Sequence, residues 1–362
     1  MVNPPPLVSV NPLPKAPPKD LWLAVNFSMF YPGLGQVYAG EWQKALLWFS
    51  SYSLSVGTGL WAIFSATGDV ATGLIFLGIA FALYWLNLVD ALLSVFHQNP
   101  SFYQEKIPRR WKNPWFAVFA TRVLPGLGHF YYQQFVLGLV ILTLAILSFR
   151  LQYRYTPLLV FGPILSAIAL YHLYRSALSK QGVSSRLIYG LIFLILLIGL
   201  TFNFFPKWLS QRIDIFFVPS ASMSPTVIKG DYIFVALNPD YTPQRQEIIV
   251  FKTPDKVRTK APLSADFFVK RVIGLPGESI RIDQGQVWIN DQPLAENYLA
   301  ETPDYTLPSQ VIPADHYFVL GDNRNDSFDS QEWGPLPKSA IVGQAYKIYW
   351  PLDRVRSLLP AD

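Results

Sequence analysis

The feature that most constrains this chain is a set of long apolar stretches in its first 205 residues. About 20 consecutive apolar residues cross the hydrocarbon core of a bilayer as a helix. We therefore expect five membrane-spanning helices. The stretches run approximately over residues 45–65, 70–96, 136–149, 157–174 and 186–205. The composition agrees, because 51% of the residues are hydrophobic and only 15% are charged, which is unusual for a single soluble domain.

Basic residues beside these stretches predict how the helices cross the membrane. Lysine and arginine gather in the linkers 97–115 and 175–186, which lie on the same side if all five stretches span. Cytoplasmic loops carry an excess of such residues, so that side is predicted to be cytoplasmic. The N-terminus would then lie in the cytoplasm, and residues after 206 on the trans side, whether periplasmic, extracellular or lumenal. Arg150 and Arg154 would lie on the opposite side of the membrane, contrary to this rule.

The membrane part contains an internal repeat. Pro32-Gly-Leu-Gly-Gln-Val-Tyr38 recurs as Pro125-Gly-Leu-Gly-His-Phe-Tyr131, each before a pair of apolar stretches, and is similar to small membrane-hairpin modules. Such glycines let helices approach closely, which favours a packing and turn device; a partner-binding or regulatory surface is the alternative. Residues 1–20 are proline-rich without an apolar core, which predicts a disordered cytoplasmic tail and not a cleavable signal peptide. The transmembrane region is therefore assigned to residues 21–205.

After residue 206 the pattern changes to short β-branched and aromatic runs separated by Gly, Pro, Asn and Asp, which predicts β-strands. The expected strands are Ile213–Val218, Tyr232–Ala236, Glu247–Lys252, Phe267–Ile273, Ser279–Ile282, Gln286–Ile289, His316–Leu320 and Gln344–Trp350. Asp283–Gln286 and Asn290-Asp291 are predicted hairpin turns. The predicted fold class is an N-terminal α-helical transmembrane region followed by an all-β extracytoplasmic catalytic domain over residues 206–362.

The residue types present narrow the possible chemistry. With no cysteine, thiolate catalysis, disulfides and thiolate metal sites are excluded. His129 and His172 have no carboxylate at metal-ligand spacing, so we expect no metal and no cofactor. His316 is the one histidine after residue 206, which leaves little for a Ser/His/Asp triad. The net charge of +5 gathers beside the apolar stretches, which argues against a nucleic-acid partner.

Three segments of the β half carry candidate chemistry. Pro219-Ser-Ala-Ser-Met-Ser-Pro-Thr226 places two serines after a strand, although such a segment alone is more often a polar turn. Lys270 lies in an apolar run, where burial would lower the pKa of its amine and let it accept a proton; a solubilising lysine at a strand edge is the equal alternative. The segment 321–337 is a polar loop bounded by glycine, and its acidic residues match no EF-hand spacing.

Taken together, the motifs Ser-x-Ser-Met-x-Pro-Thr, Lys-Arg-Val-x-Gly-Leu-Pro-Gly and Gly-Asp-Asn-Arg…Ser-x-Asp-Ser…Trp-Gly-Pro resemble type I signal peptidases (leader peptidases) over nearly all of residues 206–350. The resemblance implies that Ser222 is the nucleophile and Lys270 the general base. It also implies that the Ser220 hydroxyl stabilises the oxyanion and that Ser327 forms a hydrogen bond to Lys270 and orients it. Asp329 would support the loop that carries Ser327, and Asp322 would pair with Arg271. The residues implied to line the substrate groove are Ile215, Phe217 and Met223.

Some positions depart from the family pattern. The usual Arg-Gly-Asp before the lysine strand appears as Arg245-Gln-Glu247, and the common Asp-Asn is reversed to Asn325-Asp326. Gln331 stands where an arginine is frequent, which puts one ion pair to Asp329 in doubt. The membrane part departs most, because the family usually carries one to three anchors.

The resemblance implies a membrane-bound serine endopeptidase that removes signal peptides of the Ala-x-Ala type from exported preproteins by acyl transfer. Its partners would be preprotein signal peptides and the lipid bilayer, with the secretion translocon as a further candidate. One alternative is an inactive peptidase-like membrane scaffold whose hairpin repeats bind a partner. Another is a transporter, which needs ionisable groups inside the spans; Asp90, near a span end, is the single one that qualifies.

Overall fold

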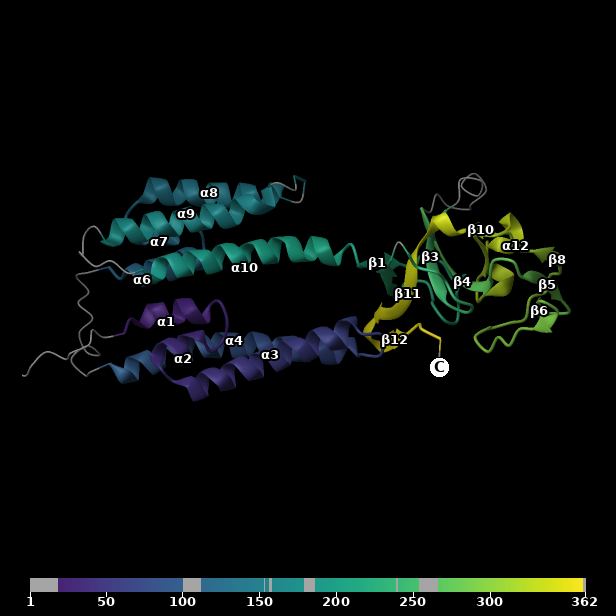
Figure 1. Ribbon diagram of the computed structural model, residues 1–362, viewed down its shortest axis with the longest axis horizontal. Coiled ribbons are helices and arrows are strands. Elements are labelled where there is room, and N and C mark those ends of the chain that lie inside the picture. The colour runs from purple at the N-terminus through teal and green to yellow at the C-terminus, as the bar shows by residue number, and fades with distance from the viewer. Residues whose placement is uncertain are drawn as a thin grey trace, which may run out of the picture. The chain divides into compact units, whose positions relative to one another are not determined.

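The computed structural model describes residues 19–99, 112–152, 154–155, 158–178, 186–238, 240–253 and 266–360 (Figure 1). The predicted tail lies outside the described residues up to position 18, as does most of the basic linker 97–115. The contacts divide the chain into two compact units. The first comprises Met1–Leu54 and Ile79–Phe204, and the second comprises Ser55–Gly78 and Phe205–Asp362.

All the regular elements among the described residues of the N-terminal region are helices. Its helices are α1 (Leu21–Ser28), α2 (Leu34–Ala39), α3 (Trp42–Phe64), α4 (Val70–Gln98), α6 (Pro114–Val123), α7 (Leu127–Tyr131), α8 (Phe135–Leu151), α9 (Leu158–Leu178) and α10 (Leu187–Leu209). The five predicted apolar stretches correspond to α3, α4, α8, α9 and α10 within a few residues. Among the described helices, α4, α9 and α10 are long and apolar enough to cross a membrane, and α8 is a shorter apolar helix.

The repeated glycine motif forms the same turn twice. Gly33 precedes α2 with a φ of 101°, and Gly126 precedes α7 with a φ of 94°. A Cβ at Gly33 would lie 2.6 Å from the carbonyl oxygen of Ala45, and one at Gly126 would lie 2.3 Å from that of Gly138. Both the left-handed backbone and the close contact require glycine, so each motif joins a short helix to the long helix that follows.

A polar contact joins α9 to α10 in the first unit. Pro163 lies inside α9 and has no N–H, so the carbonyl of Leu159 lacks its partner within the helix. The Asn203 side chain on α10 donates to that carbonyl at 2.6 Å. Gly199 lets the helices approach, since a Cβ there would lie 3.0 Å from the Pro163 ring. This contact fixes α10, the helix that leads into the first strand.

The second unit contains two antiparallel sheets. The larger has the order β1 (Ile213–Phe217), β2 (Tyr232–Leu237), β11 (Ile341–Trp350), β3 (Ile248–Lys252), β4 (Phe267–Gly274), β9 (His316–Leu320) and β10 (Leu336–Pro337), with β12 (Arg356–Ser357) paired to β11. The smaller has the order β7 (Gln292–Pro293), β6 (Gln286–Ile289), β5 (Ser279–Asp283) and β8 (Leu307–Val311). A β-rich domain after apolar helices is the predicted fold class.

The predicted strands agree closely with the structure. All eight are present with ends within three residues, and both hairpin turns connect paired strands, β5 to β6 and β6 to β7. Gln284, Asn290 and Asp291 have positive φ angles of 50°, 49° and 60°, as tight hairpin turns require. The prediction missed β7, β8, β10, β12 and the short helix α12 (Ser330–Trp333), because these elements are very short or carry polar residues and proline without clear alternation.

Candidate active site

The closest contact between candidate catalytic groups joins Ser222 and Lys270. Lys270 lies in β4, where it pairs with Ile249 of β3, and Ser222 lies in the loop after β1. The Nζ atom of Lys270 is 2.5 Å from Oγ of Ser222. The lysine is only 2% exposed, so its amine meets the serine hydroxyl away from bulk water.

Burial decides the protonation of this lysine. Desolvation lowers the pKa of Lys270 to about 8, although the negative charges of Asp329, Asp322 and Asp326 act in the opposite direction. At neutral to mildly basic pH a useful fraction of the amine is therefore uncharged. An uncharged amine in contact with a serine hydroxyl can take its proton.

The Ser222 loop packs tightly against the segment after β9. The hydroxyls of Ser220 and Ser222 are 3.3 Å apart, and the carbonyl of Ser222 accepts a hydrogen bond from the N–H of Asn323 at 3.1 Å. A Cβ at Gly321 would lie 2.4 Å from that carbonyl and 2.2 Å from Oγ of Ser327. Glycine is therefore needed for these two segments to meet.

Asp329 organises the loop that follows. Its carboxylate accepts hydrogen bonds from the hydroxyl of Ser327 at 2.6 Å and from the N–H of Gly321 at 2.9 Å. It also caps α12 through the N–H of Gln331 at 3.1 Å. Burial raises the pKa of Asp329, and these hydrogen bonds oppose that rise. Asp329 thus supports the loop by accepting hydrogen bonds from uncharged donors. The side chain of Gln331 adds a further contact within the loop, since it donates to the carbonyl of Ser327 at 3.4 Å.

The position of Ser327 differs from the prediction. Its hydroxyl was expected to bond to Lys270, yet the hydroxyl proton goes to Asp329, and no hydrogen bond joins these two described residues, Ser327 and Lys270. A carboxylate is the stronger acceptor, which explains why it takes the single proton of the hydroxyl. Ser327 still borders the groove beside Lys270.

Arg271, the residue after Lys270, forms a buried ion pair with Asp322. Its Nε and Nη2 atoms donate to the two carboxylate oxygens at 2.8 and 2.6 Å, and the two residues are 6% and 0% exposed. The guanidinium lies 3.9 Å from the ring centre of Tyr298. Consecutive strand residues point to opposite faces, so Lys270 and Arg271 connect β4 to different partners.

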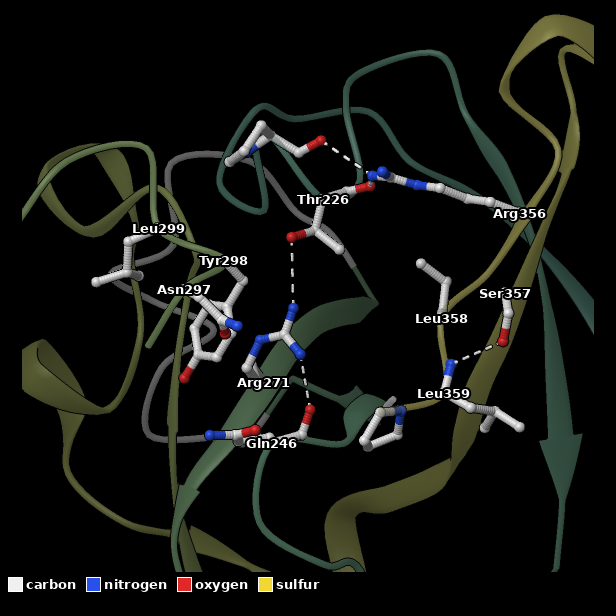
Figure 2. Close-up of a pocket in the computed structure, with 12 residues that line it drawn as sticks. Thr226, Gln246, Arg271, Asn297, Tyr298, Leu299, Arg356, Ser357, Leu358 and Leu359 are labelled. Carbon is white, nitrogen blue, oxygen red and sulfur yellow. Dashed lines mark hydrogen bonds between the residues drawn. The ribbon is translucent and has the colours of Figure 1, made fainter. Parts of the chain in front are cut away.

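A cavity of about 430 Å³ lies beside Arg271, at residues that directly follow the Ser222 loop (Figure 2). Arg271 reaches the hydroxyl of Thr226 at 3.4 Å and the carbonyl of Gln246 at 2.7 Å. From the other side, Arg356 donates to the carbonyls of Pro225 and Thr226. Arg271 and Arg356 therefore hold the end of the loop that carries Ser222 by hydrogen bonds from two sides. No sequence signal marked Arg356, because it follows the last predicted strand.

A groove of about 400 Å³ contains the Ser222–Lys270 contact. Phe217 and Met223 line it as predicted, whereas Ile215 is not among its described lining residues. Ile215 pairs with Phe234 farther from the Ser222 loop, which explains this correction. The prediction missed the lining residues Phe267, Phe268, Phe328 and Glu332. Alternation from Lys270 would have placed Phe268 on the groove face.

Comparisons with known proteins show which proteins this chain resembles. The family model described as "Signal peptidase, peptidase S26" matches residues 186–350. Signal peptidase I of Leptolyngbya laminosa is 43% identical over 149 residues, which cover 40% of this chain and 72% of the relative. Probable thylakoidal processing peptidase 2 of Arabidopsis thaliana is 37% identical over 145 residues, 39% of each chain. A crystal structure of a signal peptidase I from Enterococcus faecalis V583 is 31% identical, covering 29% of this chain and 97% of that chain with a TM-score of 0.25.

The first of these relatives is matched over more than two thirds of its length. The match to the family model begins at the start of α10 and ends with β11, so it includes Ser222, Lys270 and the loop around Asp329. The chain therefore belongs to the signal peptidase I family of serine peptidases, peptidase S26.

Proposed function

We propose that this protein is a membrane-bound serine endopeptidase that removes N-terminal signal peptides from exported preproteins, with Ser222 as nucleophile and Lys270 as general base. The observation that carries the proposal is the 2.5 Å separation between the buried amine and the serine hydroxyl. Membership of the signal peptidase I family supports the same assignment.

The reaction would proceed by acyl transfer. The oxygen of Ser222 attacks the carbonyl carbon of the scissile bond while its proton moves to Lys270. The negative oxygen that forms accepts hydrogen bonds from the Ser222 backbone N–H and the Ser220 hydroxyl. Lys270 then returns the proton to the leaving amine as the peptide bond breaks. Water, deprotonated by Lys270, cleaves the resulting ester and restores Ser222.

The groove suits a small-residue cleavage signal. Its phenylalanine side chains and volume of about 400 Å³ leave an apolar space for the residues before the cut, which the proposal assigns to the small side chains of an Ala-x-Ala signal. The substrate would bind in extended form along a strand edge. Phe217, which is 52% exposed near the groove, can insert at the membrane interface, where aromatic side chains are favoured. In this proposal the domain works on the trans side and the N-terminus lies in the cytoplasm.

The proposal is tested with the full chain in detergent or liposomes and one precursor that carries an Ala-x-Ala signal. The expected result is a single cut after the second alanine, identified by sequencing the new N-terminus. Replacing that alanine with tryptophan in the precursor should prevent the cut. A cut that ignores this replacement, or no cut with an intact signal, would contradict the proposal.

The same assay should reveal the titration of Lys270. Because the base must be uncharged and burial lowers its pKa to about 8, kcat/KM should rise with pH, about tenfold per unit well below pH 8, and level off above it. The measurement is kcat/KM on a short peptide between about pH 6 and pH 10. A flat profile across this range would show that no group with the pKa of Lys270 limits the reaction.

A further inference from the structure

A second buried lysine, Lys347 in β11, has no role in the proposed chemistry. Its side chain is 0% exposed, and its Nζ atom donates to three backbone carbonyls, those of Ala62, Ile63 and Ser65, at 2.9, 2.8 and 2.9 Å. These acceptors lie more than 280 positions earlier in the chain. An ammonium has three donors, so every donor of Lys347 is used in this one contact.

The three carbonyls belong to the end of α3 and the turn after it. The last carbonyls of a helix have no partner within the helix and carry the negative end of its dipole. The buried ammonium of Lys347 therefore supplies the missing hydrogen-bond donors at this helix end, and its positive charge faces the negative end of the helix dipole. A Cβ at Gly68 would lie 2.4 Å from the carbonyl of Ala62, so the turn itself folds tightly against the same helix end.

A bulge in β11 directs Lys347 toward the turn. Ala345 and Ile348 both face the core of the larger sheet, although residues three apart in a regular strand face opposite sides. The register with β2 shifts between Ala345 and Lys347, which places Tyr346 and Lys347 together on the outer face. Bulges characteristically redirect side chains in this way.

Aromatic rings extend the contact around the lysine. Phe64, the last residue of α3, lies 5.6 Å from Phe234 of β2 between ring centres. Phe234 in turn stacks on Tyr349 at 4.3 Å and on Tyr346 at 5.9 Å. Phe234 lies on the outer face of the sheet and is nevertheless only 4% exposed, so the α3 end covers an apolar patch that would otherwise face solvent.

We infer that the outer face of β2 and β11 is a docking surface for the turn between α3 and α4, with Lys347 as the positioning residue that locks the turn in place. This contact gives the β domain a second attachment besides its covalent link to α10. The contact holds β2 and its neighbour β1, the strand that leads to Ser222, in a fixed position against the α3–α4 turn.

The docking is tested by the accessibility of a single cysteine, since the chain has none of its own. The Oγ atom of Ser65 is buried, so Ser65→Cys in the membrane-reconstituted full chain should react slowly with a water-soluble maleimide. Adding Lys347→Met should raise the rate at least about tenfold, the size of one lost hydrogen bond to a charged group. Phe64→Ala, which removes the ring of α3 that packs against Phe234, should also raise the reaction rate of Ser65→Cys.

Matched controls separate undocking from unfolding. Thr67→Cys, exposed two residues away, should react fast with or without Lys347→Met. Val235→Cys, at a fully buried core position of β2, should stay protected in both backgrounds. Lys338→Met, which removes a lysine from another part of the domain, should leave the Ser65→Cys rate unchanged. The inference fails if Ser65→Cys reacts as fast as Thr67→Cys, or if Lys347→Met does not change its rate.

A functional readout rests on the proposed peptidase activity. Lys347→Met should slow cleavage of a precursor embedded in the same liposomes about tenfold, while cleavage of a short soluble peptide stays within about twofold, because the Ser222 site itself is intact. Equal rates on both substrates would overturn the positioning role. If the wild-type chain cleaves neither substrate, the proposed function fails, and the cysteine accessibility still decides the docking.

Discussion

Replacing Lys270 with methionine is expected to reduce kcat for preprotein cleavage about 10³-fold, within the range of general-base contributions. Methionine keeps nearly the length of the side chain but cannot accept a proton, so Ser222 would lose the group that takes its hydrogen at 2.5 Å. The same variant should no longer show a rise in activity through pH 8, since the titrating amine is gone.

The fold of this variant should survive. The amine of Lys270 is buried and partly uncharged, and burying an amine costs free energy that an apolar side chain of similar volume does not cost. The melting temperature should therefore be unchanged or higher. Lys338→Met, the same substitution outside the groove, is the control and should retain full activity. A Lys270→Met enzyme that cleaves at the wild-type rate would remove Lys270 from the mechanism.

Replacing Ser222 with alanine is expected to lower cleavage by on the order of 10⁶-fold, the scale seen when a serine peptidase loses its nucleophile. No other group can form the ester, and the Oγ of Ser220, 3.3 Å away, has no hydrogen bond to Lys270 among the described residues. Labelling by an acylating active-site inhibitor should disappear with the activity, as followed by mass spectrometry of the full chain.

Two neighbouring serines serve as matched controls. Ser224→Ala, in the same loop but outside the groove lining, should retain nearly full activity. Ser220→Ala should reduce kcat about 10²-fold and leave inhibitor labelling at Ser222 intact, because it removes one donor to the oxyanion and not the nucleophile. Labelling that persists in Ser222→Ala would place the nucleophile elsewhere. A wild-type chain that neither labels nor cleaves would favour the inactive scaffold.

Local sequence patterns were sufficient for the long helices and for eight of the strands. Runs such as Leu187–Leu200 have too many apolar residues for a segment that faces water, and they form the long helices. Alternation and β-branched residues placed eight strands within three residues of their ends. They failed at β8, where Leu307-Pro-Ser-Gln-Val311 shows no clear pattern, because that strand is stabilised by pairing with β5 and not by its own residues.

The sequence motifs predicted which residues form the site but not all of the hydrogen bonds between them. The family motifs singled out Ser222, Lys270 and the loop around Asp329, but the direction of a hydroxyl proton depends on competing acceptors in space. Ser327 therefore bonds to Asp329 and not to Lys270. Arg356 and Lys347 gave no signal, since their partners, Thr226 and the α3 end, are distant in sequence.

By itself, the sequence determined the apolar helices, the β half and the candidate residues, because those depend on side-chain chemistry and short-range periodicity. The tertiary structure alone decided the surroundings of each buried charge. It sets the lowered pKa of Lys270 through desolvation, the hydrogen bond that Asp329 accepts from Ser327, and the capping of α3 by Lys347. A charge removed from water must find partners wherever the fold brings them, and strand pairing and helix ends supply those partners over distances that no local pattern records.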